Sequence, residues 1–300
     1  MQLEVKDVNK HYGKNHVLKD VSFTAKTGRT LGLLGRNGHG KSTIMKSIMG
    51  IINYETGSIT IDGEKITQKR FKLGYLPEER GLYAKVNVLD QMTYFGKLRG
   101  LSSSEAKKRS EDFIQKLEME EYKTKKAQEL SKGNQQKIQL AIALLNDPDV
   151  LILDEPYSGL DPVNAAMLLS FVDDAVKKGK LVIFSSHQLS TVEEFCDDIC
   201  IINKGSIVAA GNIKEIKKEY PRKEIYVEPS ELSSYLKDEK IEDFKNGITV
   251  KFDGEEHKKR ILNKLIETEI ETFKIVEPTL LEIFLDKIGE SGEGIRGDNE

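Results

Sequence analysis

Cysteine, tryptophan and long apolar runs are scarce or missing in this sequence of 300 residues, which has two cysteines and no tryptophan. Two cysteines cannot build a disulfide framework, and Cys196 and Cys200 alone supply too few ligands for a metal site. Their spacing predicts reduced thiols on one face of a helix. No run approaches the ~18 apolar residues of a membrane-spanning helix, and the N-terminus lacks the apolar segment of a signal peptide. We therefore expect a cytoplasmic protein whose contact with a membrane is peripheral.

Net charge is also low, at −3 at pH 7. Residues 211–300 are acidic, with 16 Lys+Arg against 22 Asp+Glu, and the residues before them are mildly basic. Charges of both signs are interspersed, whereas a nucleic-acid groove needs a concentrated basic stripe. We therefore expect no nucleic-acid partner.

The pattern of apolar residues predicts an α/β fold. Apolar and polar residues alternate over residues 1–30, which predicts antiparallel strands. A short apolar run at 30–35 is followed by glycines and then by helical spacing at 42–50, so that a strand, a loop and a helix succeed one another. VLILD and LVIFSS are typical of buried parallel strands, and residues of about 85–145 have the composition of a helical insertion. Together these elements predict one large domain over residues 1–210.

The pattern changes in residues 211–288, where strands and helices alternate within a short length. KEIYVE and NGITVKF predict strands with a polar helix between them, and a final helix is expected from Thr279. This order predicts a small α+β accessory domain, for which a ferredoxin-like arrangement is one of several possibilities. Residues 289–300 are rich in glycine and charge, which predicts a disordered tail.

The segment GRNGHGKS, residues 35–42, fits the phosphate-binding pattern G-x-x-x-x-G-K-[ST] directly after a predicted strand. Its glycines leave backbone N–H groups free to surround phosphates at a helix N-terminus. Lys41 would reach the β- and γ-phosphates, and Ser42 would coordinate Mg²⁺. The nucleotide-binding residues predicted in this segment are Gly35, Asn37, Gly38, Gly40, Lys41, Ser42 and Thr43.

Two adjacent carboxylates end the apolar run VLILDEP. Successive strand residues face opposite ways, so Asp154 and Glu155 cannot share one role. Asp154 suits the Mg²⁺ shell and Glu155 suits a general base that polarises the attacking water, although two solvated acids at a strand end are the structural alternative. A GTPase would carry the guanine-reading pattern N-K-x-D, but Asn203-Lys204-Gly205-Ser206 lacks the aspartate. The predicted nucleotide is therefore ATP.

The order of these motifs resembles the ABC ATPase family over residues 1 to about 210, which implies its P-loop NTPase fold. The resemblance assigns Tyr12 to the aromatic position that stacks on adenine. It also assigns Asp161 in SGLDP to the D-loop and His187 in FSSHQL to the switch histidine that contacts the γ-phosphate. The implied catalytic residues are Glu155 and His187.

LSKGNQQ, residues 130–136, resembles the LSGGQ signature of the family, with Lys132 in place of a glycine and Asn134 in place of the glutamine. In the family this segment begins a helix whose N-terminus faces the γ-phosphate of ATP bound by a second copy. The resemblance therefore implies a head-to-tail homodimer. In that dimer Ser131, Gly133 and Asn134, together with the Asp161 segment, would bind ATP in trans.

The glutamine that usually ligates Mg²⁺ in this family is replaced by Glu78 in GYLPEERGLY. A carboxylate can still serve, so the predicted metal ligands are Ser42, Glu78 and Asp154. PEERG and the ending VEPTLLEIFLDKIGE resemble a subgroup that serves ABC-2 type permeases in the export of sodium, drugs or antibiotics.

The implied function is ATP hydrolysis that energises a separate integral-membrane permease at the inner face of the plasma membrane. One alternative is a non-transport ABC ATPase with a regulatory role. Such proteins usually carry two cassettes or a long coiled coil, whereas this sequence has one phosphate loop and no sustained heptads. A module that holds ATP without turnover is a third reading, against which the presence of Glu155 and His187 argues. The transported substrate is not encoded in this chain, because substrate contacts lie in the permease.

Overall fold

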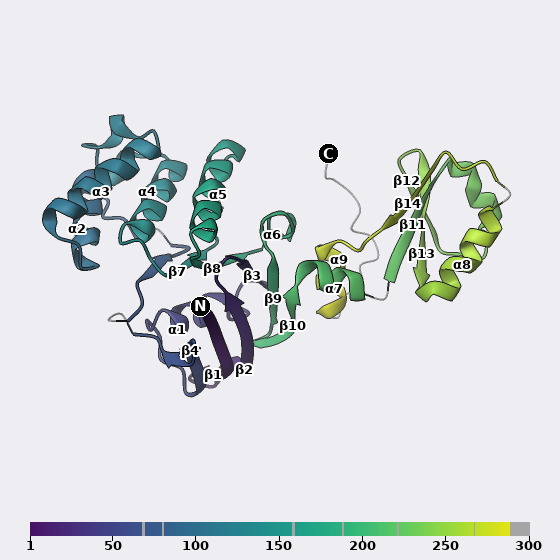
Figure 1. Ribbon diagram of the computed structural model, residues 1–300, viewed down its shortest axis with the longest axis horizontal. Helices are drawn as coiled ribbons and strands as arrows, with labels where there is room; N and C mark the ends of the chain where they lie inside the picture. The colour runs from purple at the N-terminus through teal and green to yellow at the C-terminus, as the bar shows by residue number, and fades with distance from the viewer. Residues whose placement is uncertain are drawn as a thin grey trace. The chain divides into compact units, whose positions relative to one another are not determined.

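A computed structural model describes residues 1–67, 70–79, 81–157, 160–187, 189–220, 222–266 and 268–288 (Figure 1). The chain divides into two compact units, Met1–Gly211 and Asn212–Glu300. Within the described ranges, no helix combines the length and the apolar character that crossing a bilayer requires. The predicted tail at 289–300 and the start of the D-loop motif, Ser158 and Gly159, lie outside the described residues.

The first unit begins with an antiparallel sheet in the strand order β2-β1-β4-β5. Its strands are β1 (Gln2–Tyr12), β2 (Asn15–Lys26), β4 (Thr56–Ile61) and β5 (Glu64–Lys65). Leu3 and Val5 of β1 are buried while their neighbours are exposed, as the alternating sequence requires of a sheet that covers a core on one face. The prediction of antiparallel strands over the first thirty residues is confirmed by the pairing of β1 with β2.

A second sheet has the strand order β10-β9-β3-β8-β7-β6. Its strands are β3 (Thr30–Leu34), β6 (Leu73–Leu76), β7 (Val150–Asp154), β8 (Leu181–Ser186), β9 (Asp198–Asn203) and β10 (Ser206–Asn212), and the helices beside them are α1 (Lys41–Ile48), α5 (Pro162–Lys177) and α6 (Leu189–Phe195). Every residue of β3, β7 and β8 is buried, which explains their unbroken apolar runs. These strands pair in parallel, so their carboxyl ends meet at one edge.

The predicted helical insertion lies between β6 and β7, and its main helices α2, α3 and α4 gather at one end of this unit (Figure 1). They are α2 (Val88–Leu98), α3 (Ser103–Lys116) and α4 (Lys132–Leu144), with 3₁₀ turns at Glu120–Tyr122 and Ala127–Glu129. Ser102 begins α3 by accepting a hydrogen bond from the backbone N–H of Glu105 at 3.2 Å. Arg109 reaches the carbonyl of Leu145 at 2.9 Å, which satisfies a backbone group at the end of α4. The insertion therefore has its own caps and its own apolar core.

The second unit contains an antiparallel sheet in the order β12-β13-β11-β14. Its elements are α7 (Ile213–Glu219), β11 (Arg222–Glu228), a 3₁₀ turn (Ser230–Tyr235), β12 (Ile241–Phe244), β13 (Gly247–Asp253), α8 (Gly254–Leu265), β14 (Thr272–Val276) and α9 (Leu280–Lys287). The strand order is that of a ferredoxin-like sheet, one of the arrangements considered from the sequence, with a 3₁₀ turn in place of the first helix of that fold. Thr279 caps α9 as predicted.

Two local predictions were wrong. The polar helix expected between β11 and β13 is a 3₁₀ turn followed by β12, because the second half of this segment pairs with β13 as a hairpin, at whose turn Lys245 takes a left-handed conformation with φ of 55°. The two thiols do not share a helix face, since α6 ends at Phe195 and Cys200 lies within β9. Both cysteines are free, and burial raises the pKa of each thiol.

Candidate active site

The phosphate loop connects β3 to α1 through backbone positions that exclude larger residues. A Cβ added at Gly35 would lie 2.4 Å from the carbonyl oxygen of Ile202. Gly40 has φ of 107°, in the left-handed region, and immediately precedes the first residue of α1. The glycines therefore let the loop pass close to β9 and then enter α1. At this helix N-terminus the backbone N–H groups are available to bind an anion.

Lys41 is the first residue of α1 and is only 6% exposed. Its ammonium Nζ donates to the carbonyl oxygen of Gly35 at 2.6 Å and lies 3.8 Å from Oε1 of Glu155. Burial lowers the pKa of Lys41, while the carboxylates of Glu155, Asp154 and Glu78 oppose that shift. The lysine is thus held inside the loop with three carboxylates within electrostatic reach.

The remaining predicted residues of this segment flank Lys41. Ser42 and Thr43 lie half-buried in the first turn of α1, and Asn37 is exposed on the loop. Gly38 has φ of 80°, so the loop uses a second left-handed glycine. All of these positions lie on the loop or in the first turn of α1, at the carboxyl edge of the parallel sheet.

Asp154 and Glu155 follow each other at the end of β7 but point to different partners. Asp154 is 2% exposed, and its Oδ1 accepts a hydrogen bond from the hydroxyl of Ser185 at 2.7 Å. The same hydroxyl oxygen accepts from the backbone N–H of Glu155 at 3.0 Å. Glu155 has φ of 48°, a left-handed conformation that costs a non-glycine residue about 1–3 kcal/mol. This backbone turn directs the two carboxylates apart.

Ser185 was not predicted as a site residue. It pairs in register with Asp154 across β7 and β8, so its hydroxyl lies between the two carboxylate-bearing residues. A polar residue inside the buried run LVIFSS was the signal that could have identified it.

His187 follows β8 and faces Glu155. The distance between Nδ1 of His187 and Oε2 of Glu155 is 2.7 Å, and the backbone N–H of His187 donates to the same oxygen at 3.4 Å. The other oxygen of Glu155, Oε1, is buried and has no hydrogen-bond partner among the described residues. One carboxylate therefore joins the histidine to the lysine of the phosphate loop, and keeps an acceptor position for a further donor.

The predicted metal ligands Ser42, Glu78 and Asp154 supply a hydroxyl and carboxylate oxygens, the hard ligands that Mg²⁺ prefers. Glu78 is exposed and follows β6, while Asp154 is buried. Among the described residues, no group of three or more His, Cys, Asp or Glu side chains is arranged to hold a metal ion. Because Mg²⁺ usually takes one or two carboxylates together with water and substrate phosphates, this sparse donor set fits it.

The signature and D-loop residues begin two neighbouring helices. Ser131 is exposed and caps α4, accepting from the backbone N–H of Asn134 at 3.2 Å. Asp161 caps α5, accepting from the backbone N–H of Asn164 at 3.0 Å, and this bond holds the pKa of Asp161 below its usual range. A Cβ added at Gly133 would lie 3.4 Å from the amide nitrogen of Asn164. The two helix starts therefore lie side by side on the surface of the first unit.

Tyr12 ends β1 and is 49% exposed, and Nζ of Lys10 lies 5.4 Å from the centroid of its ring. Thus the structure brings Lys41, Asp154, Glu155 and His187 together. In the described part of the chain, Tyr12 and the signature segment make no hydrogen bond to that cluster. A further contact missed from the sequence is the buried amide of Gln136, which donates from α4 to the carbonyl of Pro156 at 3.1 Å.

Comparison with known proteins assigns a family to each part of the chain. Residues 18–158 match the ABC transporter family, and residues 211–288 match the family described as ATP-binding protein DrrA1-3-like, C-terminal domain. The chain is 39% identical over 263 residues to an ABC transporter ATP-binding protein of Alkalihalophilus pseudofirmus, an alignment that covers 86% of this chain and 98% of the relative.

Two further likenesses agree with this assignment. The chain is 35% identical over 213 residues to the linearmycin resistance ATP-binding protein LnrL of Bacillus subtilis, covering 70% of this chain and 68% of that protein. A solved structure of the ATP-binding subunit of an ABC transporter superimposes with a TM-score of 0.67 and 32% identity over 73% of this chain and 93% of its own. With a P-loop fold, and with a buried lysine, a buried glutamate and an exposed histidine at the sheet edge, the chain belongs to the ABC transporter family as one of its ATP-binding subunits, the ATPases that energise a membrane permease.

Proposed function

We propose that Glu155 is the general base of ATP hydrolysis and that His187 orients it. The observation that carries this proposal is the position of the buried Glu155 carboxylate, whose two oxygens lie 2.7 Å from His187 and 3.8 Å from Lys41. Lys41 and the N–H groups of the loop would hold the β- and γ-phosphates, leaving Glu155 beside the γ-phosphate to take a proton from the attacking water. Ser185 would keep the neighbouring Asp154 in place.

Mg²⁺ would be held by Ser42, Asp154 and Glu78, where it would neutralise charge on the phosphates. Asp154 suits this role because its buried carboxylate is fixed by Ser185 at 2.7 Å. Glu78 places a negative charge where the family usually has a neutral amide. Its carboxylate acts to raise the pKa of Lys41, which supports a position close to the phosphates.

We further infer that two copies bind ATP between them, head to tail. Tyr12 would stack on adenine, which its half-exposed ring allows. Ser131, Gly133 and Asn134 at the start of α4 would contact the γ-phosphate of the ATP held by the other copy, with the Asp161 segment beside them. Support comes from the exposure of Ser131 and from the adjacent starts of α4 and α5.

The permease is proposed to dock on a groove between the core and the helical insertion. A cavity of about 660 Å³ lies between the end of α1, the segment after β6, and helices α2 and α4. The apolar side chains of Ile51 and Leu98 line it and are exposed, and Tyr83 stacks on Phe95 at 5.7 Å beside it. Exposed apolar surface of this kind marks a protein contact. Docking there would hold the chain on the inner face of the plasma membrane.

The transporter served is proposed to be an ABC-2 type exporter. The relative LnrL is named for linearmycin resistance, and the C-terminal match is to a domain of an ATP-binding protein of the DrrA1-3 kind. On this proposal residues 1–210 form the ATPase domain, and 211–288 form an accessory domain that is not needed for nucleotide binding. The alternative is a regulatory ATPase without a permease. It would be favoured if adding membranes that carry the permease left the rate of ATP hydrolysis unchanged.

Phosphate release from the purified protein with Mg-ATP tests the proposal. Wild type should turn over ATP, and Lys41→Ala should lose most of its ATP affinity because a methyl group cannot replace the ammonium at the phosphates. Lys46→Ala is the matched control, since Lys46 lies on the same helix in its last turn. Wild-type affinity in Lys41→Ala would contradict the assignment of the loop.

A further inference from the structure

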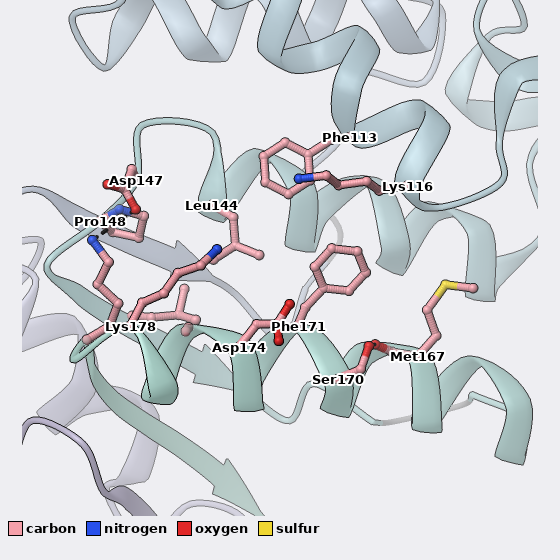
Figure 2. A pocket seen from close by; sticks show the side chains of 13 residues that line it. Phe113, Lys116, Leu144, Asp147, Pro148, Met167, Ser170, Phe171, Asp174 and Lys178 are labelled. Carbon is pink, nitrogen blue, oxygen red and sulfur yellow. Dashed lines mark hydrogen bonds and ion pairs between the residues drawn. The ribbon is translucent and has the colours of Figure 1, made fainter.

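A second groove of the first unit lies away from the nucleotide site, between the helical insertion and α5. It has a volume of about 320 Å³, at the lower end of the roughly 300–1,000 Å³ that small-molecule sites occupy. Figure 2 shows Phe113 and Lys116 above it on one helix, and Met167, Ser170 and Phe171 along the helix below. These side chains come from α3 and α5, and the loop with Asp147 and Pro148 forms one end (Figure 2).

The walls of the groove are apolar. Phe113 and Phe171 face each other with ring centroids 6.2 Å apart, and both are half-buried. Leu144 and Met167 extend the same wall and are also half-buried. Aromatic and aliphatic surface that is left half-buried around a cavity favours an apolar occupant, because filling the cavity removes more of that surface from water.

The rim is charged and mainly positive. Three lysines and two aspartates line the groove, which gives it a formal charge of +1. Lys180 is neutralised by Asp147, with their side chains 2.9 Å apart. Lys116 and Lys178 have no carboxylate within 4.0 Å in the described part of the chain; Nζ of Lys116 instead lies 5.7 Å from the centroid of the Phe113 ring. Asp174 is the one remaining negative group.

We propose that this groove binds a linear amphipathic anion, an alkyl chain with one acidic head group. The alkyl chain would lie along Phe113, Phe171 and Met167. The head group would lie at the rim, where Lys116 and Lys178 are free to pair with it. A cationic amphiphile would leave the two ammonium groups unpaired and add a third, so the charge of the rim selects against it.

Decanoate is the probe for this proposal, and a single tryptophan is the reporter. The sequence has no tryptophan, so Phe171→Trp places the only indole in the wall of the groove. Saturable binding of decanoate below its micellar range should shift the emission of that indole to shorter wavelength. Octanoate should bind about 15-fold more weakly, because each methylene moved from water to an apolar site changes affinity about fourfold. Tyr94→Trp is the control reporter, because Tyr94 lies on α2 and does not line the groove.

The charge of the rim is tested in the Phe171→Trp background. The double substitution Lys116→Glu and Lys178→Glu should weaken decanoate binding at least tenfold. Lys177→Glu is the matched control, because Lys177 lies on the same helix, pairs with Asp173 at 2.6 Å and does not line the groove. It should leave the affinity unchanged, and decyltrimethylammonium should not bind.

Several results would overturn the proposal. They are the absence of a saturable shift, a response only near the micellar concentration, equal affinity in the double Glu variant, or equal binding of the cationic amphiphile. If vesicles of an anionic phospholipid shift the indole and free decanoate does not, the surface recognises a membrane and the small-molecule site is rejected. Circular dichroism of each variant separates loss of binding from loss of fold.

Discussion

The Glu155→Gln substitution isolates the basicity of one side chain. Glutamine keeps the length of the side chain and an oxygen that can accept a hydrogen bond from His187, but it cannot take up a proton from water. A positioned general base contributes about 10²–10⁴ in rate, so the barrier to hydrolysis should rise by about 3–5 kcal/mol. The carboxylate is 6% exposed and has its partners at 2.7 Å and 3.8 Å, so solvent offers no ready replacement for the base.

Single-turnover phosphate release at saturating ATP is the appropriate assay, because it separates the chemical step from binding. ATP affinity should be retained or increased, since the change removes a negative charge near the phosphates. Glu79→Gln is the control, because Glu79 is an exposed acid in the segment after β6. A Glu155→Gln protein that is folded, binds ATP and hydrolyses it at the wild-type rate would refute the assignment of the base.

Three further predictions concern stability and domain organisation. Tyr157→Phe should stabilise the protein by about 1 kcal/mol in urea unfolding, because the buried hydroxyl of Tyr157 has no hydrogen-bond partner among the described residues; a loss of stability would show that the hydroxyl is satisfied. Glu239→Gln should destabilise the second unit by about 1–3 kcal/mol, since Glu239 pairs with His257 at 2.8 Å and with Lys264 at 3.2 Å. The hydrogen bond from His257, and after it the one from Lys264, holds the pKa of Glu239 below its usual range. The stabilisation from this carboxylate is therefore present above about pH 4.3 and is lost as the pH falls through the lowered pKa. Below that pH the variant and wild type should have the same free energy of unfolding. Removal of residues 212–300 should leave ATP binding intact by equilibrium dialysis, and an unfolded truncated protein by circular dichroism would contradict the proposed boundary.

Much of the fold follows from local patterns in the sequence. The phosphate loop could be predicted because glycine, lysine and serine occur at fixed spacing between a buried strand and a helix. Asp154 could be placed beside it because the carboxyl ends of parallel strands meet at one edge of a sheet. The parallel pairing of β3 with β8 and of β8 with β7 agrees with that expectation.

Features that depend on contacts between distant segments could not be predicted. Ser185 lies between Asp154 and Glu155 only because β7 and β8 pair in one particular register. The left-handed backbone of Glu155 is imposed by its surroundings, since the intrinsic preference of glutamate opposes it. The short strand β12 was missed because Glu242 and Asp243 give its sequence the composition of a polar loop, and pairing with β13 overrides that local preference.

The most direct test of the central claim is size-exclusion chromatography with light scattering of Glu155→Gln in Mg-ATP. If two copies share their ATP and Glu155 is the base, the variant should run as a dimer that retains two ATP molecules. It should return to monomer when ATP is omitted, and wild type should be mostly monomer once its ATP is hydrolysed. A variant that binds ATP without hydrolysing it and yet remains a monomer at all concentrations of ATP would contradict the shared-site mechanism.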